Sequence, residues 1–233
     1  MQRAQYHEQY RLPHQQNPMK LHGIPFSNYY NMAKHAVLFK GIACEFVTTR
    51  PSQEPDYLAK SPMGKIPLLE TEQGCITETD VILDYLDEVF PTPRLFPQDA
   101  FARAKVRQLM KVQELYIETP AHNLIGLVFG RDLAQHVKDA SQAEARKGLA
   151  ALARLVQFGP WIAGGEFTAA DIVVFHSFVL SNRLTKLSYG WDMLPEVPGL
   201  VAWFERVGAL DITQRIMADN QAAADALAGR LKK

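Results

Sequence analysis

The chain has 233 residues, of which 47% are hydrophobic and 21% charged, and its 25 basic side chains balance 25 acidic ones. This composition is typical of a folded globular protein, and the length suffices for one large domain or two modest ones. The balanced charge argues against nucleic acid as a partner, and no apolar run approaches the roughly 18 residues that a membrane span needs, so we expect a cytoplasmic protein without a membrane partner.

Residues 1–18 are rich in Gln, His, Tyr and Pro without apolar periodicity, and we predict that they form a flexible N-terminal extension. A strand is predicted over 19–24. The turn Pro25-Phe26-Ser27-Asn28 then leads into an apolar helical pattern that ends at Phe39, with Gly41 just beyond it. A second strand over 44–49 follows after a short connection. The order strand, helix, strand predicts a parallel pair.

A polar, proline-containing stretch over 50–64 precedes two strand-like runs, 66–70 and 75–77, which a hairpin-type turn separates. A helix is predicted over 80–90. Thr77-x-x-Asp80 has the spacing of a capping signal for the start of this helix. The first part of the chain therefore reads as a βαβ unit followed by a ββα unit.

Prolines at 91, 93 and 97 interrupt the chain after this helix, and we place a domain boundary here. Thr168-x-x-Asp171 is a capping box that opens a strongly apolar helix, so Asp171 is expected to be buried and hydrogen-bonded. The predicted fold class is an α/β domain over 19–97 followed by an all-α domain over 98–233. Helical spacing in the second domain covers residues 101–118, 141–157, 169–187, 198–207 and 211–231.

Two features of the first domain suggest a binding site. Pro67 opens a strand that would otherwise be central, so the Ile66–Pro67 bond is either an ordinary trans bond, the more common outcome, or a cis bond. Glu78-Thr79 stands where a strand meets a helix N-terminus, which can hold a carboxylate while the Glu pairs with an ammonium group. The alternative is that a threonine caps the helix and Glu78 is solvated.

Together these segments resemble the cytosolic glutathione S-transferases, serine-type and bacterial in character. The resemblance rests on the strand–turn–helix with Ser27, the run Ser61-Pro62-Met63-Gly64-Lys65-Ile66-Pro67-Leu68-Leu69, the Glu78-Thr79 pair, and the all-α second half with its Thr168–Asp171 folding motif. It implies a thioredoxin-like first domain, a helical-bundle second domain, and glutathione as co-substrate.

The resemblance also implies roles for single residues. Pro67 matches the family's cis-proline, and Ile66 would pair its main-chain N–H and C=O with the cysteinyl part of glutathione. Glu78 and Thr79 would hold the γ-glutamyl ammonium and carboxylate groups. Lys65 would reach the glycyl carboxylate, although a solvated lysine fits this position equally well.

Ser27 is the first choice for the residue that stabilises the thiolate of glutathione, because a hydroxyl donor and a helix N-terminus both favour negative charge on sulfur. The family's serine-type members often continue with a Pro-Cys-Arg run, whereas this chain continues with Asn28-Tyr29-Tyr30. Asn28, Tyr30 or Tyr29 could therefore replace or assist Ser27.

The resemblance further implies an apolar electrophile site between the domains, for which Tyr116, His122 and Phe129 are candidates beside Leu127; ordinary packing is the alternative role for each. It implies a homodimer with Asp80 or Arg107 near the interface, and a part in detoxification. The histidines form no metal-binding motif, and the two cysteines have neither zinc-site nor dithiol spacing, so no metal is expected.

We therefore predict a glutathione transferase that activates reduced glutathione for attack on a small hydrophobic electrophile. Two alternatives stay open. One is a disulfide-bond reductase or peroxidase in which glutathione supplies every thiol. The other is a glutathione-binding protein of the same fold without turnover.

Overall fold

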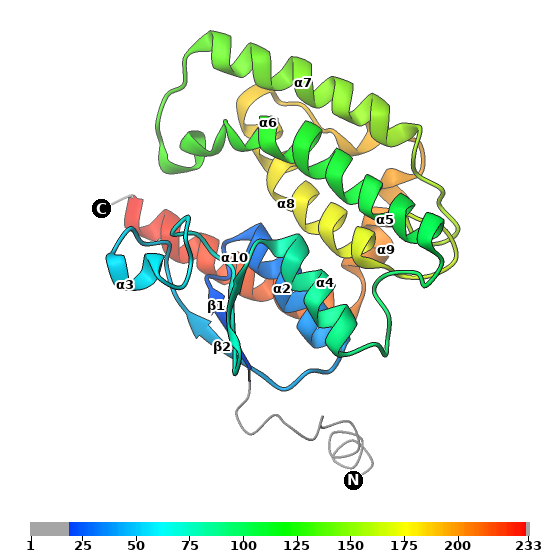
Figure 1. Ribbon diagram of the computed structural model, residues 1–233. Helices are drawn as coiled ribbons and strands as arrows, with labels where there is room; N and C mark the ends of the chain where they lie inside the picture. Colours follow the sequence, from blue (N-terminus) through cyan, green and yellow to red (C-terminus); the bar gives the residue numbers. More distant parts are fainter. Residues whose placement is uncertain (1–18, 232–233) are drawn as a thin grey trace. The chain divides into compact units, whose positions relative to one another are not determined.

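The computed structural model describes residues 19–231, which form two compact units (Figure 1). The first unit ends at Pro93 and the second begins at Arg94, within the proline-rich segment. The predicted N-terminal extension, residues 1–18, lies outside the described residues.

The first unit contains a four-stranded sheet in the order β2-β1-β3-β4. β1 pairs in parallel with β2 and antiparallel with β3, and β3 pairs antiparallel with β4, so the predicted parallel pair and hairpin are confirmed. Leu21 faces Leu69 across β1 and β3, and neither side chain is exposed, because alternate strand residues point into the core. The strands are β1 (Met19–Gly23), β2 (Cys44–Thr48), β3 (Leu68–Thr71) and β4 (Gly74–Thr77).

Two helices, α2 (Asn28–Phe39) and α4 (Thr79–Val89), lie side by side in this unit and pack against each other (Figure 1). Their buried positions, such as Ala36 in α2 and Ile82 in α4, supply the apolar core. A short helix that the sequence did not predict, α3 (Pro55–Leu58), interrupts the polar stretch after β2.

Lys40, the residue that follows α2, ties the end of this helix to the end of α4. Its side chain is fully buried, and its Nζ donates to Asp87 Oδ1 at 2.6 Å. The same Nζ donates to the carbonyl oxygens of Phe90 at 2.8 Å and Pro93 at 2.7 Å. Three acceptors thus satisfy the ammonium group in an interior where an unpaired charge would be costly.

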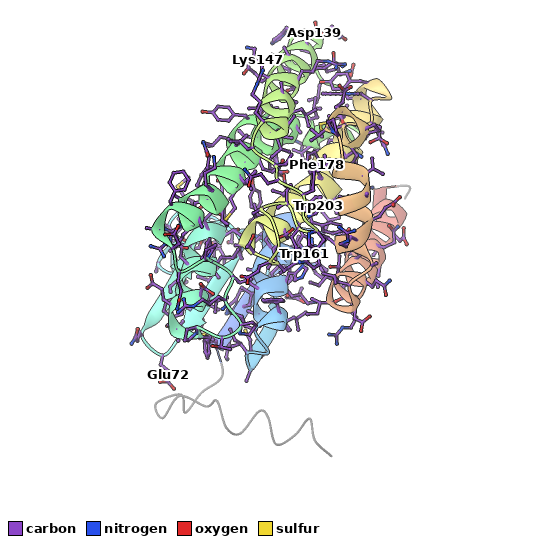
Figure 2. The ribbon with its side chains drawn as sticks, turned by 90° about the vertical axis from the view of Figure 1, so that its right-hand side faces the viewer. Glu72, Asp139, Lys147, Trp161, Phe178 and Trp203 are labelled. Atoms are coloured by element: carbon purple, nitrogen blue, oxygen red, sulfur yellow. The ribbon has the colours of Figure 1, made fainter. Side chains whose placement is uncertain are left out.

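The helices of the second unit are joined by loops, one of which holds an isolated β-bridge between Trp161 and Gly164. The helices α5 (Ala100–Gln113) and α8 (Ala169–Tyr189) form one of its main packing contacts. Phe178 and Trp203 point into its interior, whereas Lys147 on α7 points outward (Figure 2). None of the helices in the described chain is long and apolar enough to cross a membrane. The longer helices are α5 (Ala100–Gln113), α7 (Gln135–Ala153), α8 (Ala169–Tyr189), α9 (Leu200–Gly208) and α10 (Asp211–Leu231).

The predicted capping box at the start of α8 is confirmed, and Asp171 is buried as expected. Its carboxylate accepts hydrogen bonds from the N–H of Thr168 at 2.9 Å and from the N–H of Ile162 at 2.9 Å. The indole N–H of Trp203 donates to it at 2.8 Å. One side chain therefore fixes the helix start, the preceding loop and α9.

The helix predicted over 101–118 is not a single regular helix. α5 ends at Gln113 and continues as a π-helical segment η1 (Glu114–Glu118), followed by the short α6 (Thr119–His122). Gly148 of α7 lies against this segment so closely that a Cβ would be 2.2 Å from the carbonyl oxygen of Tyr116. The 3-10 helices η2 (Ile125–Phe129) and η3 (Leu194–Glu196) complete the second unit.

Candidate functional site

Three segments that the sequence singled out meet at one edge of the sheet. His22 near the end of β1 pairs with Leu68 at the start of β3, and Leu68 pairs with Thr77 at the end of β4. The turn after β1, the residues before β3 and the residues after β4 therefore project from the same edge. Ser27, Ile66-Pro67 and Glu78-Thr79 belong to these three segments.

Ser27 is the N-cap residue of α2, with an extended backbone and a partly exposed side chain. Its Oγ accepts a hydrogen bond from the N–H of Tyr30 at 3.3 Å, a long distance that indicates a weak cap. Within the described residues the Ser27 hydroxyl donates to no acceptor. Its proton therefore remains available to an acceptor outside the protein, beside the positive end of the helix dipole.

Asn28 and Tyr30, the other two catalytic candidates, are more buried than Ser27. Asn28, the first residue of α2, is 5% exposed, and Tyr30 is 3% exposed. The Tyr30 ring lies against Gly23, where a Cβ would come within 2.2 Å of Cδ2, so the phenol packs under the end of β1. Tyr29 is partly exposed. Of the candidate residues in this turn, Ser27 and Tyr29 are therefore the more accessible ones.

Asn31, in the first turn of α2, is a buried polar residue that the sequence analysis did not single out. Its Nδ2 donates to the carbonyl oxygen of Pro25 at 2.8 Å, and the residue is 1% exposed. Its Oδ1 is buried without a hydrogen-bond partner in the described chain, which costs about 1–3 kcal/mol. The available signal was a polar residue directly before the apolar residues Met32 and Ala33 of the predicted helix.

The Ile66–Pro67 peptide bond is cis, as the family resemblance implied. The preceding loop is held by Ser61, whose Oγ donates to the carbonyl of Lys65 at 2.8 Å and accepts from the Lys65 N–H at 3.1 Å. Neither main-chain polar group of Ile66 hydrogen-bonds to another described residue, so both can pair with an extended ligand. The Lys65 side chain is exposed.

Glu78 is the N-cap residue of α4, with φ 67° and ψ 122°, and it is the one non-glycine residue with positive φ among those described. Such a backbone costs of order 1–3 kcal/mol and is common at functional sites. The Glu78 side chain is exposed, whereas Thr79 is 7% exposed in the first turn. The capping signal Thr77-x-x-Asp80 was wrong, because the helix begins one residue earlier and has no side-chain cap.

Neither cysteine supplies a reactive thiol at this edge. Cys44 pairs with Met19 at the opposite end of the sheet, and burial raises its pKa to about 12. The pKa of Cys75 is raised by burial and by the neighbouring charge of Glu70. Because the thiolate is the reactive form, any sulfur chemistry at this edge must use a thiol that a ligand supplies.

The electrophile-site candidates lie in the second unit. Tyr116 in η1 is 51% exposed and Phe129 in η2 is 41% exposed, so both present apolar surface. His122 in α6 is held by Glu118, whose Oε1 lies 3.3 Å from its Nδ1. Glu118 is buried and accepts a hydrogen bond from the Ser177 hydroxyl at 2.7 Å. The imidazole thus has one ring nitrogen fixed by a buried carboxylate.

Comparison with family models and curated proteins gives a consistent result. Residues 21–94 match a model described as glutathione S-transferase, N-terminal domain, and residues 135–206 match its C-terminal domain. A glutathione S-transferase of Pseudomonas putida is 41% identical over 206 residues, covering 88% of this chain and 94% of that protein. Mouse glutathione S-transferase omega-2 is 34% identical over 119 residues, about half of each chain.

Solved structures show the same architecture. A Tau class glutathione S-transferase from mango has a TM-score of 0.75 at 23% identity, covering 92% of this chain and 98% of that one. Glutathione transferase Omega 3C from Trametes versicolor has a TM-score of 0.72 at 23% identity, covering 91% and 93%. The predicted order of a thioredoxin-like domain followed by a helical domain is confirmed.

Proposed function

The chain belongs to the cytosolic glutathione S-transferase family and acts as a glutathione transferase, and we propose that Ser27 stabilises the thiolate of bound glutathione. A free thiol with a pKa near 8.5 is only a few per cent ionised at neutral pH. A hydroxyl donor and a helix N-terminus beside the sulfur both favour the thiolate and lower that pKa. The thiolate then attacks an electrophilic carbon and forms a carbon–sulfur bond. In a substitution, the bond to the leaving group breaks and that group departs with the bonding electron pair; in an addition, the π electron pair of the attacked double bond moves to the neighbouring atom, which takes up a proton.

The observation that carries this proposal is the uncommitted Ser27 proton at the N-terminus of α2, on the sheet edge that Ile66 and Glu78 share. The positions of the Ile66-Pro67 and Glu78-Thr79 segments support a tripeptide lying along this edge. The free main-chain groups of Ile66 suit its cysteinyl part, with Pro67 fixing the strand start.

The ends of the tripeptide are assigned by charge. The exposed Glu78 carboxylate suits the γ-glutamyl ammonium group, and the Thr79 hydroxyl with the first N–H groups of α4 suits the carboxylate beside it. Lys65 is the proposed partner of the glycyl carboxylate, since its side chain is exposed beside Ile66.

For the electrophile we propose a small hydrophobic compound that contacts Tyr116, His122 and Phe129. Two of these side chains expose aromatic surface, and His122 adds a fixed ring nitrogen. A cytoplasmic homodimer with a part in detoxification completes the proposal, with Asp80 or Arg107 near the interface. Light scattering tests the dimer, and a monomeric mass would contradict it.

A disulfide-bond reductase or peroxidase activity is the second candidate. Because the pKa of both cysteine thiols is raised, glutathione would supply every thiol in such a reaction. Turnover of a mixed glutathione disulfide faster than conjugation of any aryl halide would favour this candidate.

The direct test compares the parent with Ser27→Ala in glutathione affinity, by calorimetry, and in conjugation rate with an aryl halide. We expect Ser27→Ala to lower kcat by about 10²-fold and to change the glutathione affinity by less than about three-fold. Ser141→Ala is the matched control, because Ser141 Oγ is buried in the second unit without a hydrogen-bond partner in the described chain. Unchanged turnover in Ser27→Ala would refute the assignment of Ser27.

A further inference from the structure

The turn that joins β1 to α2 is fixed at both of its ends. The N–H of Ser27 donates to the carbonyl of Ile24 at 3.0 Å and closes the turn. The N–H of Asn31 donates to the carbonyl of Ser27 at 3.0 Å and forms the first turn of the helix. The side-chain amide of Asn31 reaches back to the carbonyl of Pro25 at 2.8 Å. One residue thus bonds to the turn through its backbone and through its side chain.

Packing alone does not account for an asparagine at this position. Asn31 is 1% exposed, and the residues that follow it, Met32 and Ala33, belong to the apolar core. Its Oδ1 is buried without a hydrogen-bond partner among residues 19–231, so a leucine of similar size would fill the space without an unsatisfied acceptor. What a leucine cannot supply is the donor to Pro25.

We infer that Asn31 is a positioning residue, which sets the place of the Ser27 hydroxyl through its hydrogen bond to Pro25. The inference rests on the proposed role of Ser27 at the sulfur. Pro25 and Ser27 are separated by one residue, so fixing the Pro25 carbonyl against α2 limits the motion of Ser27. A donor stabilises charge only where it is held in place, and a displacement of about 1 Å can cost a large factor in rate.

The test uses Asn31→Leu and Asn31→Asp in the full chain, with reduced glutathione as the probe. Both variants remove the donor to Pro25, and Asn31→Asp also adds a negative charge near the sulfur. For Asn31→Leu we expect the pKa of bound glutathione to rise by about one unit, which lowers conjugation at neutral pH about ten-fold, with glutathione affinity within about two-fold. Asn31→Asp should raise that pKa further.

Asn182→Leu is the matched control, because it removes a second buried asparagine from the other unit. Asn182 Nδ2 donates to Asp192 at 3.0 Å, and its Oδ1 accepts from the Met193 N–H at 2.7 Å. This control should lower thermal stability and leave the pKa of bound glutathione unchanged. If Asn31→Leu does not unfold cooperatively, Asn31→Ala, which removes the donor to Pro25 without adding a charge, decides the outcome.

The outcomes separate this inference from the proposed function. If Ser27→Ala raises the bound thiol pKa but neither Asn31 variant does, the positioning role is wrong and the role of Ser27 stands. A change in the Asn31 variants that is confined to thermal stability also overturns the positioning role. If the parent does not lower the thiol pKa of glutathione, the proposed function and this inference fail together.

Discussion

Trp203 donates its indole N–H to the carboxylate of Asp171 at 2.8 Å, and both side chains are buried. The same carboxylate accepts from Thr168 and Ile162, so its two oxygens serve donors from three parts of the second unit. Burial raises the pKa of Asp171, and the hydrogen bonds oppose this shift. The network therefore holds a carboxylate at a place where its desolvation is costly.

Replacing Asp171 with asparagine should lower the free energy of unfolding by about 3 kcal/mol, because the amide N–H₂ would face donors. Chemical denaturation followed by tryptophan fluorescence measures this loss. Asp225→Asn on the exposed face of α10 is the control and should change stability by less than about 0.5 kcal/mol. Equal stabilities for the two variants would show that Asp171 has no such role.

Lys40→Met should destabilise the first unit by about 3–5 kcal/mol, because it leaves the buried carboxylate of Asp87 without its cation. The double variant Lys40→Met/Asp87→Leu should lose less stability than Lys40→Met alone. A double-mutant cycle on unfolding free energies measures the coupling. If the free-energy losses of Lys40→Met and Asp87→Leu add up to the loss in the double variant, Lys40 acts only through the Phe90 and Pro93 carbonyls.

Gly148→Ala should cost about 1–3 kcal/mol, because its Cβ would lie 2.2 Å from the Tyr116 carbonyl oxygen and force α7 away from the π-helical segment. A Cβ at Gly229 in α10 meets no described atom within 4 Å, so Gly229→Ala should instead stabilise the helix by up to about 1 kcal/mol. The thermal unfolding temperatures of the two variants, each compared with the parent, measure the cost of the close contact at Gly148 and the gain in helix propensity at Gly229. A stabilising Gly148→Ala would contradict the described contact.

Acid should destabilise the first unit through His35, which is fully buried in α2. Burial lowers its pKa from 6.5 to about 4, so between these values the unfolded chain binds a proton that the folded chain does not. The contribution to stability is complete above pH 6.5 and is lost as the pH falls toward 4. Between pH 7 and pH 5 the parent should lose about 2 kcal/mol more than His35→Leu.

Urea denaturation of both proteins at the two pH values provides the comparison. The difference between their losses isolates His35 from carboxylates that titrate in both. If the parent and His35→Leu lose the same free energy, the acid sensitivity arises elsewhere.

The order of elements followed from periodicity, because long apolar stripes and glycine or proline boundaries are local signals. Two details were not predictable in this way. The strand β3 begins at Leu68, two residues later than predicted, and the four-residue helix α3 was not predicted at all. The π-helical segment was not predicted either. Gly148, which lets α7 pack closely against this segment, lies thirty residues further along the chain. Contacts between distant residues leave no local pattern.

The candidate functional site also combines features that the sequence predicted with features that have no local sequence signal. The dipeptide Ile66-Pro67 alone favoured a trans bond, and only the family resemblance implied the cis bond that the structure has. The positive φ of Glu78 had no signal, because glutamate is not a residue that favours this region. Asn31 was overlooked because its use depends on the path of the turn back to Pro25.

The most direct test of the account is an ultraviolet difference titration of protein-bound glutathione against pH, in the parent and in Ser27→Ala. Thiolate absorbance gives the pKa of the bound thiol without any electrophile. The account predicts a value well below 8.5 in the parent and a return toward 8.5 in Ser27→Ala. A bound thiol whose pKa is the same in both proteins would contradict it and direct attention to Asn28, Tyr29 and Tyr30.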